Sequence, residues 1–224
     1  MSVASAQTNE LGGWNIANLN YRFNPKISVY AEVQERSQKL VDDFFYHELK
    51  TGVSYHLQKN SFFFGLGNYK TYTYPGNFEK PVTANEFRMW EQFVLNNNID
   101  RVKIEHRYRV EQRWVNGDYF NRFRYRLNPI VPLNHKTISA NTIYISAFDE
   151  VFFTNKAPYF IRNRVFGGAG YQFSKLFAFQ MGFIRQFDYN TVNNGTGKNF
   201  IQTSFIFNVD KSNSKHEAHP STMD

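Results

Sequence analysis

Polar and apolar residues alternate along residues 101–114 of the chain. Charged side chains take most of the odd positions, while the even positions are mostly apolar and end in Trp114. Successive side chains of a β-strand point to opposite faces, so this period of two predicts one long strand with a charged face and an apolar face. Such strands are typical of a transmembrane β-barrel with lipid outside and a polar lumen inside.

The same alternation recurs along the chain and brings the number of candidate strands to eleven. The other segments lie at about residues 14–23, 27–36, 44–57, 62–74, 85–95, 119–131, 143–150, 160–173, 177–183 and 199–209. Bacterial single-chain barrels have an even number of strands. We therefore predict an all-β fold, a single antiparallel transmembrane barrel of twelve strands, with ten as the next possibility. One strand is then missed or over-counted, or residues 7–13 run back through the lumen.

Three regions are expected along the chain. Residues 1–6 contain Ala4-Ser5-Ala6, which fits the small-x-small cleavage pattern of a secretory signal. They are interpreted as a signal-peptide remnant or a cloning scar, with an ordinary flexible tail as the alternative. Residues 7–210 form the barrel. Residues 211–224 are polar and are expected to be a disordered tail.

Composition supports a barrel and argues against several other classes. Aromatic residues reach 18%, yet mean hydropathy is only −0.55, because apolar residues alternate with polar ones. No apolar run is long enough for a transmembrane helix, and the absence of cysteine excludes disulfides and thiolate sites. The net charge of +7 invites a nucleic-acid interpretation. However, lysine lies mostly in turns and arginine mostly inside strands near glutamate, so nucleic acid is not an expected partner.

A soluble β-sandwich or closed barrel with its apolar faces inward is the alternative fold. Almost every predicted hairpin contributes several phenylalanine or tyrosine residues to one face, which is more bulk than a small interior holds easily. The opposite face prefers arginine and glutamate, whereas a wet surface would more often carry lysine and threonine. Both features favour the membrane barrel.

Several arginine-rich motifs carry a resemblance to a known family. They are Asn85-Glu-Phe-Arg-Met-Trp-Glu-Gln92, Arg107-Tyr-Arg-Val-Glu-Gln-Arg113, Arg122-Phe-Arg-Tyr-Arg126, and Asn163-Arg164 followed by Gly167-Gly-Ala-Gly-Tyr171. Together they resemble an uncharacterised family of outer-membrane β-barrel proteins common in Bacteroidota, the domain of unknown function numbered 2490. The resemblance covers most of residues 14–209. It implies a fold and a bacterial outer-membrane location, and brings no activity or catalytic residues.

No motif in the sequence indicates an enzyme, a cofactor or a metal site. Gly167–Gly170 is followed by another strand residue and not by a helix, so it is interpreted as strand glycines that admit neighbouring side chains and not as a phosphate cradle. Gly65 and Gly67 are interpreted in the same way. Four scattered histidines (His47, His56, His106 and His135) fit no hydrolase motif. His216 and His219 in the tail are expected to be solvated and not to bind metal.

The candidate site is a network of charged side chains inside the barrel. Its residues are Arg88, Glu105, Arg107, Arg109, Glu111, Arg113, Arg122, Arg124, Arg126, Glu150, Arg162 and Arg164. The same parity adds Arg22, Arg36, Lys50, Arg101, Lys103, Glu32, Glu48 and Glu86. Buried charges must be paired, so the network is expected to rigidify a narrow lumen. Because cations outnumber acids, that lumen should be positive, and any leak should prefer anions.

The opposite parity predicts which side chains face lipid. These are Phe123, Tyr125, Phe179, Met181, Phe205 and Phe207. Arg185 continues the outward parity and is expected at the external rim, where it could reach lipopolysaccharide phosphates.

Three functions from different classes remain open on the sequence alone. The first is a structural or accessory subunit of an outer-membrane assembly. The second is a narrow channel or transporter for small anionic or polar solutes, and the third, less favoured, is an outer-membrane enzyme. The expected partners are membrane lipid and lipopolysaccharide, with other outer-membrane proteins as a further class.

Overall fold

The computed structural model describes residues 10–191 and 194–212. The expected signal remnant at residues 1–6 and nearly all of the expected tail, with His216 and His219, lie outside the described residues. The described chain forms eleven strands, which confirms the all-β prediction. They are β1 (Gly12–Arg22), β2 (Ile27–Lys39), β3 (Asp42–His56), β4 (Ser61–Tyr72), β5 (Val82–Ile99), β6 (Val102–Val115), β7 (Asp118–Pro132), β8 (Thr142–Thr154), β9 (Phe160–Gln172), β10 (Phe177–Tyr189) and β11 (Gly195–Asp210).

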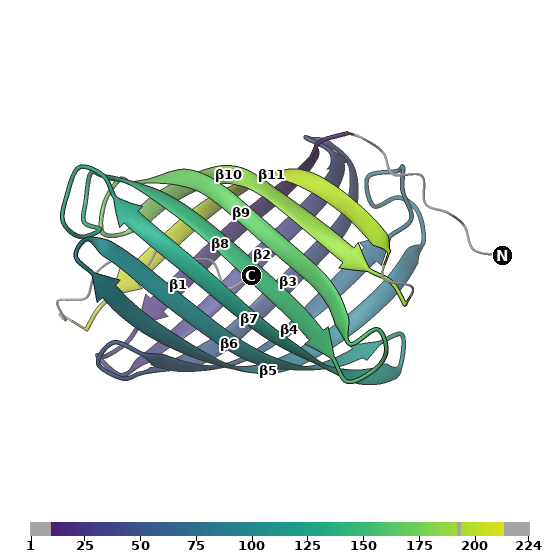
Figure 1. Cartoon of the computed structure of the whole chain (residues 1–224), viewed down its shortest axis with the longest axis horizontal. Helices are drawn as coiled ribbons and strands as arrows, with labels where there is room; N and C mark the ends of the chain where they lie inside the picture. The colour runs from purple at the N-terminus through teal and green to yellow at the C-terminus, as the bar shows by residue number, and fades with distance from the viewer. Residues whose placement is uncertain (1–9, 192–193, 213–224) are drawn as a thin grey trace.

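Each strand pairs with its neighbours in sequence, and β1 pairs with β11 to close a single barrel (Figure 1). The predicted twelve strands, and the alternative of ten, are therefore wrong. In an up-and-down barrel with an odd number of strands, the first and last strands run in the same direction. The closing pair is accordingly parallel, with Gly12 opposite Phe200 and Arg22 opposite Asp210, so the barrel is not wholly antiparallel. None of the described residues forms a helix that could span a membrane.

The barrel has two ends, which we name by their tightest turns. The Gly117 end carries the turn between β6 and β7, where Asn116 and Gly117 have positive φ angles of 50° and 96°. Asparagine and glycine tolerate this left-handed conformation, so the predicted hairpin signal is confirmed. The Asp100 end carries the turn between β5 and β6, in which Asp100 has a φ of 52°.

Side chains alternate between the barrel interior and its outer surface along every strand. On β7, Arg122, Arg124 and Arg126 are buried, whereas Phe123 is 43% exposed. On β10, Met181 and Phe183 are 47% and 45% exposed. All six side chains predicted to face outward are exposed or half-buried on the outer surface: Phe123, Tyr125, Phe179, Met181, Phe205 and Phe207. The fold places charge inside and apolar side chains outside.

The interior is less uniformly polar than the sequence pattern predicted. One apolar cluster contains Trp14, Ile16, Phe148, Phe166, Ile184 and Phe200. A second joins Tyr30, Phe63 and Trp90. At the Asp100 end, Ile138 of the connection between β7 and β8 packs with Ile130 and Tyr144 inside the barrel. These side chains fill part of the interior, and the third cluster lies toward the Asp100 end.

Inward-facing glycines make room for neighbouring groups, as expected for Gly65, Gly168 and Gly170, whereas Gly167 of the same run lies on the exposed outer face. A Cβ at Gly65 would lie 2.3 Å from the Trp90 ring, and one at Gly170 would lie 2.2 Å from the Tyr144 ring. A Cβ at Gly168 would meet the backbone of β10 at 2.4 Å, whereas nothing lies within 4 Å of a Cβ at Gly167. The inward glycines are therefore packing positions.

We expect Gly168→Ala to destabilise the barrel by about 1–3 kcal/mol, because the added methyl group meets backbone that cannot move aside. Gly167→Ala, one position away on the outer face, is the matched control and should be neutral or slightly stabilising. Urea unfolding of the protein refolded in detergent measures both. Equal effects of the two variants would contradict the inward packing of Gly168.

Candidate functional site

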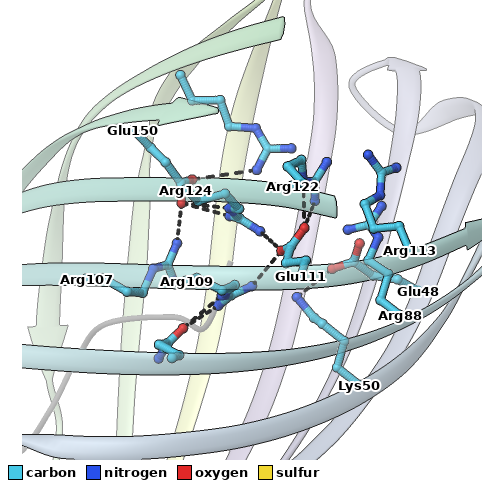
Figure 2. Close-up of polar contacts among 12 residues, drawn as sticks. Glu48, Lys50, Arg88, Arg107, Arg109, Glu111, Arg113, Arg122, Arg124 and Glu150 are labelled. Carbon is cyan, nitrogen blue, oxygen red and sulfur yellow. Dashed lines mark hydrogen bonds and ion pairs between the residues drawn. The ribbon is translucent and has the colours of Figure 1, made fainter. Parts of the chain in front are cut away.

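The structure brings the predicted charged residues together on the inner face of β5–β9. Register places Arg107 opposite Arg126, Arg109 opposite Arg124, and Glu111 opposite Arg122. Adjacent strands lie about 4.8 Å apart, so these long side chains reach one another and several share a carboxylate. Figure 2 shows this convergence around Glu111 and Glu150.

Glu111 is the centre of the network and is completely buried. Its Oε1 accepts a hydrogen bond from Arg124 Nη1 at 2.8 Å and pairs with Arg109 Nη1 at 3.4 Å. Its Oε2 accepts from Arg122 Nε at 2.5 Å. One carboxylate therefore compensates three guanidinium groups from two strands.

Glu150 on β8 connects this centre to the rest of the wall. Its Oε1 lies 2.6 Å from Arg107 Nη2 and 2.8 Å from Arg124 Nη2, and its Oε2 lies 3.8 Å from Arg164 Nη1. Arg124 thus bridges Glu150 and Glu111. The arrangement ties β6, β7, β8 and β9 together across the interior.

The remaining predicted residues form smaller groups beside the centre. Arg88 and Arg113 both donate to the carboxylate of Glu86, with each Nη2 at 2.8 Å from Oε2. Nearer the Asp100 end, Arg126 Nη2 donates to Glu105 Oε1 at 2.9 Å. All of these groups are buried except Arg113, which is half-buried.

Two acceptors of the network were not predicted from the sequence. Asp188 on β10 pairs with Arg162, and Gln92 on β5 accepts from Arg109 Nη2 at 2.7 Å. Both residues share the inward parity of their strands, so the period-two pattern was the signal that could have found them. Their partners depend on the register between strands, which that pattern does not contain.

Phe152 was also missed, although it lies among four arginines. Its ring is fully buried. Four guanidinium carbons lie 4.6–5.7 Å from its centroid, those of Arg122, Arg124, Arg162 and Arg164. The negative face of an aromatic ring attracts cations. Phe152 therefore separates and partly stabilises four like charges.

A second group of charges lies on the wall formed by β2 and β3. Lys50 Nζ lies 2.6 Å from Glu48 Oε1 and also pairs with Glu32, and Arg36 Nη2 lies 3.8 Å from Glu48 Oε2. These residues have the inward parity that the sequence predicted. Arg101 does not, because it belongs to the exposed turn between β5 and β6. Its assignment to the lumen is wrong, since the strand begins one residue later.

The histidines lie in separate places along the barrel. His106 Nδ1 lies 2.9 Å from the Tyr125 hydroxyl, and His56 Nε2 lies 2.8 Å from Ser28 Oγ. Ser28 is completely buried, whereas His56 is half-buried. Within residues 10–191 and 194–212, no group of three or more metal-ligating side chains is present.

Comparisons with known proteins give a family and one distant structural similarity. The family model described as "Protein of unknown function (DUF2490)" matches residues 11–196. No curated protein matches the sequence. Among solved structures, LpxR from Salmonella typhimurium is similar with a TM-score of 0.48 and 9% identity, over 80% of this chain and 83% of that chain. A similarity this distant carries no argument about function.

Proposed function

This chain belongs to the DUF2490 family, and we propose that it is an integral barrel of the bacterial outer membrane with a sealed interior. In this proposal it serves as a structural or accessory subunit of an outer-membrane assembly. The observation that carries the proposal is the inverted distribution of polarity. Fully buried arginines fill the interior, while large apolar side chains cover the outer surface.

The outer surface supports contact with lipid around much of the barrel. Exposed apolar side chains occur on all eleven described strands, with fractions such as 51% for Val33, 53% for Phe62 and 49% for Val165. Soluble monomers rarely expose a continuous apolar surface of this extent. In a bilayer the same surface is favourable, because hydrocarbon surrounds the barrel at that height.

Aromatic contacts at both ends support the same placement. At the Gly117 end, Trp114 and Tyr119 lie 5.2 Å apart, and Phe160 and Tyr189 lie 4.7 Å apart, measured between ring centroids. At the Asp100 end, Phe173, Phe177 and Phe207 form a row with spacings of 5.4 and 5.0 Å. Transmembrane barrels carry such aromatic girdles at the two membrane–water interfaces.

Arg185 supports a lipid-headgroup contact at the Gly117 end. It is exposed and continues the outward parity of β10, opposite Val165 and Asn199. A long cationic side chain at this position can extend toward phosphate groups at the interface. Lipid and lipopolysaccharide are therefore the partners we propose, together with other outer-membrane proteins.

A sealed interior favours the accessory role over a channel. The fully buried residues include Arg107, Glu111, Arg126, Glu150 and Phe152, all on the inner face. Their packing leaves these groups inaccessible to solvent, which opposes a continuous water path. The channel remains the second candidate because interior cations outnumber carboxylates, and a leak would then prefer anions.

Recording in planar bilayers tests this choice. After reconstitution and flotation with lipid vesicles, we expect the protein to insert without steady conductance. Arg124→Ala removes a side chain that bridges Glu111 and Glu150, so it should produce intermittent conductance through the loosened interior. Steady anion-selective conductance of the unmodified protein would contradict the sealed interior and favour the channel. Failure to float with vesicles would contradict the membrane location itself.

A further inference from the structure

The inner wall of β5–β10 carries a surplus of positive charge. Its buried and half-buried cations number ten: Arg88, Lys103, Arg107, Arg109, Arg113, Arg122, Arg124, Arg126, Arg162 and Arg164. Its carboxylates number five: Glu86, Glu105, Glu111, Glu150 and Asp188. The exposed rim of this wall at the Gly117 end adds one charge of each sign, Lys156 and Asp118, so the surplus stays at five.

The rest of the inner face is closer to balance, since Arg22 of β1 lies opposite Asp210 and Lys198 of β11 adds one further half-buried cation. On the inner face of β2 and β3, Arg36 and Lys50 are matched by Glu32 and Glu48. Charges removed from water must be compensated by opposite charge or by aligned dipoles. Glutamines and aromatic rings supply dipoles to the wall of β5–β10, but they carry no net charge. Within residues 10–191 and 194–212, no further carboxylate lies on this inner wall, and anions from solution can supply the compensating charge.

Access to the surplus is graded along the barrel axis. The side chains of Arg107 and Arg124 are 1% exposed, whereas those of Arg113 and Arg162 are 13% and 24% exposed. Both of the more exposed arginines lie toward the Gly117 end. Toward the Asp100 end, the buried Ile138, Ile130 and Tyr144 pack together inside the barrel. An anion can therefore reach the charged wall from the Gly117 end.

Two aromatic rings lie among the cations at that end, where Arg122 is buried and Arg113, Arg162 and Lys156 are half-buried or exposed. Arg113 Cζ and Lys156 Nζ lie 4.6 and 5.9 Å from the centroid of Phe120. Arg122 Cζ and Arg162 Cζ lie 5.3 and 5.7 Å from the centroid of Phe152. The group around Phe120 and the group around Phe152 are neighbours on the inner face. Phe120 and Arg122 lie on the same face of β7, and Arg162 of β9 is paired with Phe152 of β8. We call Arg113, Phe120, Arg122, Lys156 and Arg162 the mouth cluster.

We propose that the mouth cluster is a binding site for a phosphate group. Guanidinium groups present paired N–H donors that match the oxygens of an oxyanion, and the lysine adds a point charge. The carboxylates at this mouth are Glu86, Glu111, Asp188 and Asp118. Glu86 already pairs with Arg88 and Arg113. Glu111 pairs with Arg109, Arg122 and Arg124, and Asp188 pairs with Arg162. The phosphate group belongs either to free inorganic phosphate or to a phosphomonoester lipid headgroup. Binding at this site is a property beyond the accessory role proposed for the barrel.

Calorimetric titration of the refolded protein in a non-ionic detergent tests the site. One series adds inorganic phosphate at low salt, and a second adds micelles doped with phosphatidic acid. The test variant is Lys156→Gln with Arg162→Gln, which removes two of the more exposed cations of the cluster. The matched control is Lys175→Gln with Lys136→Gln, which removes two exposed cations near the Asp100 end.

We expect saturable binding that the test variant weakens about tenfold or more and the control leaves unchanged. Binding in the first series identifies free phosphate as a ligand, and binding only in the second identifies the lipid headgroup; either result supports the site. No saturable heat in either series, or equal weakening by the test and control variants, overturns it. Vesicle flotation of the same preparation reports separately on the membrane proposal.

Discussion

Glu111→Ala should destabilise the barrel by about 3–5 kcal/mol, the usual effect of removing one partner from a buried ion pair. Glu111 is fully buried and compensates Arg109, Arg122 and Arg124. Removing its carboxylate leaves these guanidinium groups beside one another in an environment that water does not reach. Unfolding by urea in detergent micelles measures the loss.

The matched control for this variant is Glu91→Ala. Glu91 lies on the outer face of β5, opposite Val110, while the neighbouring Trp90 is opposite Glu111. It is exposed and accepts a hydrogen bond from Gln112 Nε2 at 3.0 Å. Its removal should change stability by less than about 1 kcal/mol. A comparable loss in both variants would contradict the central role of Glu111.

A second test asks whether Glu111 acts through its charge. Adding Arg122→Ala to Glu111→Ala removes one of the uncompensated guanidinium groups. The double variant should therefore lose less stability than the sum of the two single variants, since residues in direct contact are not additive. Strict additivity would mean that the two side chains do not interact in solution.

Phe179→Arg should reduce the stability of the barrel in a lipid bilayer by about 2–4 kcal/mol if the position lies near the midplane. Phe179 is on the outer face of β10, where its ring lies 5.3 Å from that of Phe205. The adjacent outward residues Met181 and Phe183 are exposed. A charged group among them would have to leave water when the barrel inserts.

The control for this variant is Phe179→Leu, which keeps an apolar side chain and should cost about 1 kcal/mol or less in the bilayer. Equilibrium unfolding from lipid vesicles measures both variants. If the outer surface faces water instead, Phe179→Arg would be close to neutral. That outcome would count against the membrane location while leaving the barrel fold intact.

The face on which each side chain lies could be predicted from the sequence. The alternation assigned Arg107, Arg109 and Arg124 to the interior and Phe123 to the outer surface. The structure confirms these four assignments. The alternation of strand side chains is a local property of extended backbone, so a single strand contains the information. The tight turn at Gly117 could also be predicted, because Asn116-Gly117 is a local hairpin signal.

The number of strands and the closure of the barrel were decided by the tertiary structure. The rule that such barrels have even strand numbers led to the prediction of twelve, whereas β1 and β11 pair in parallel and close a barrel of eleven. This pairing joins the first and last strands, which are far apart in the sequence, so no local pattern specifies it. The boundary at Arg101 was also missed, because the turn geometry at Asp100 decides where β6 begins.

The partners of each charge were likewise decided only by the assembled barrel. The sequence placed Arg162 inside, but its pairing with Asp188 follows from the register of β9 and β10. The position of Phe152 among four arginines follows from three strands meeting in one register. Alternation determines the face of a side chain, whereas long-range pairing determines its neighbours. The charged residues of the interior were therefore available from the sequence, whereas its apolar clusters and the partner of each charge were not.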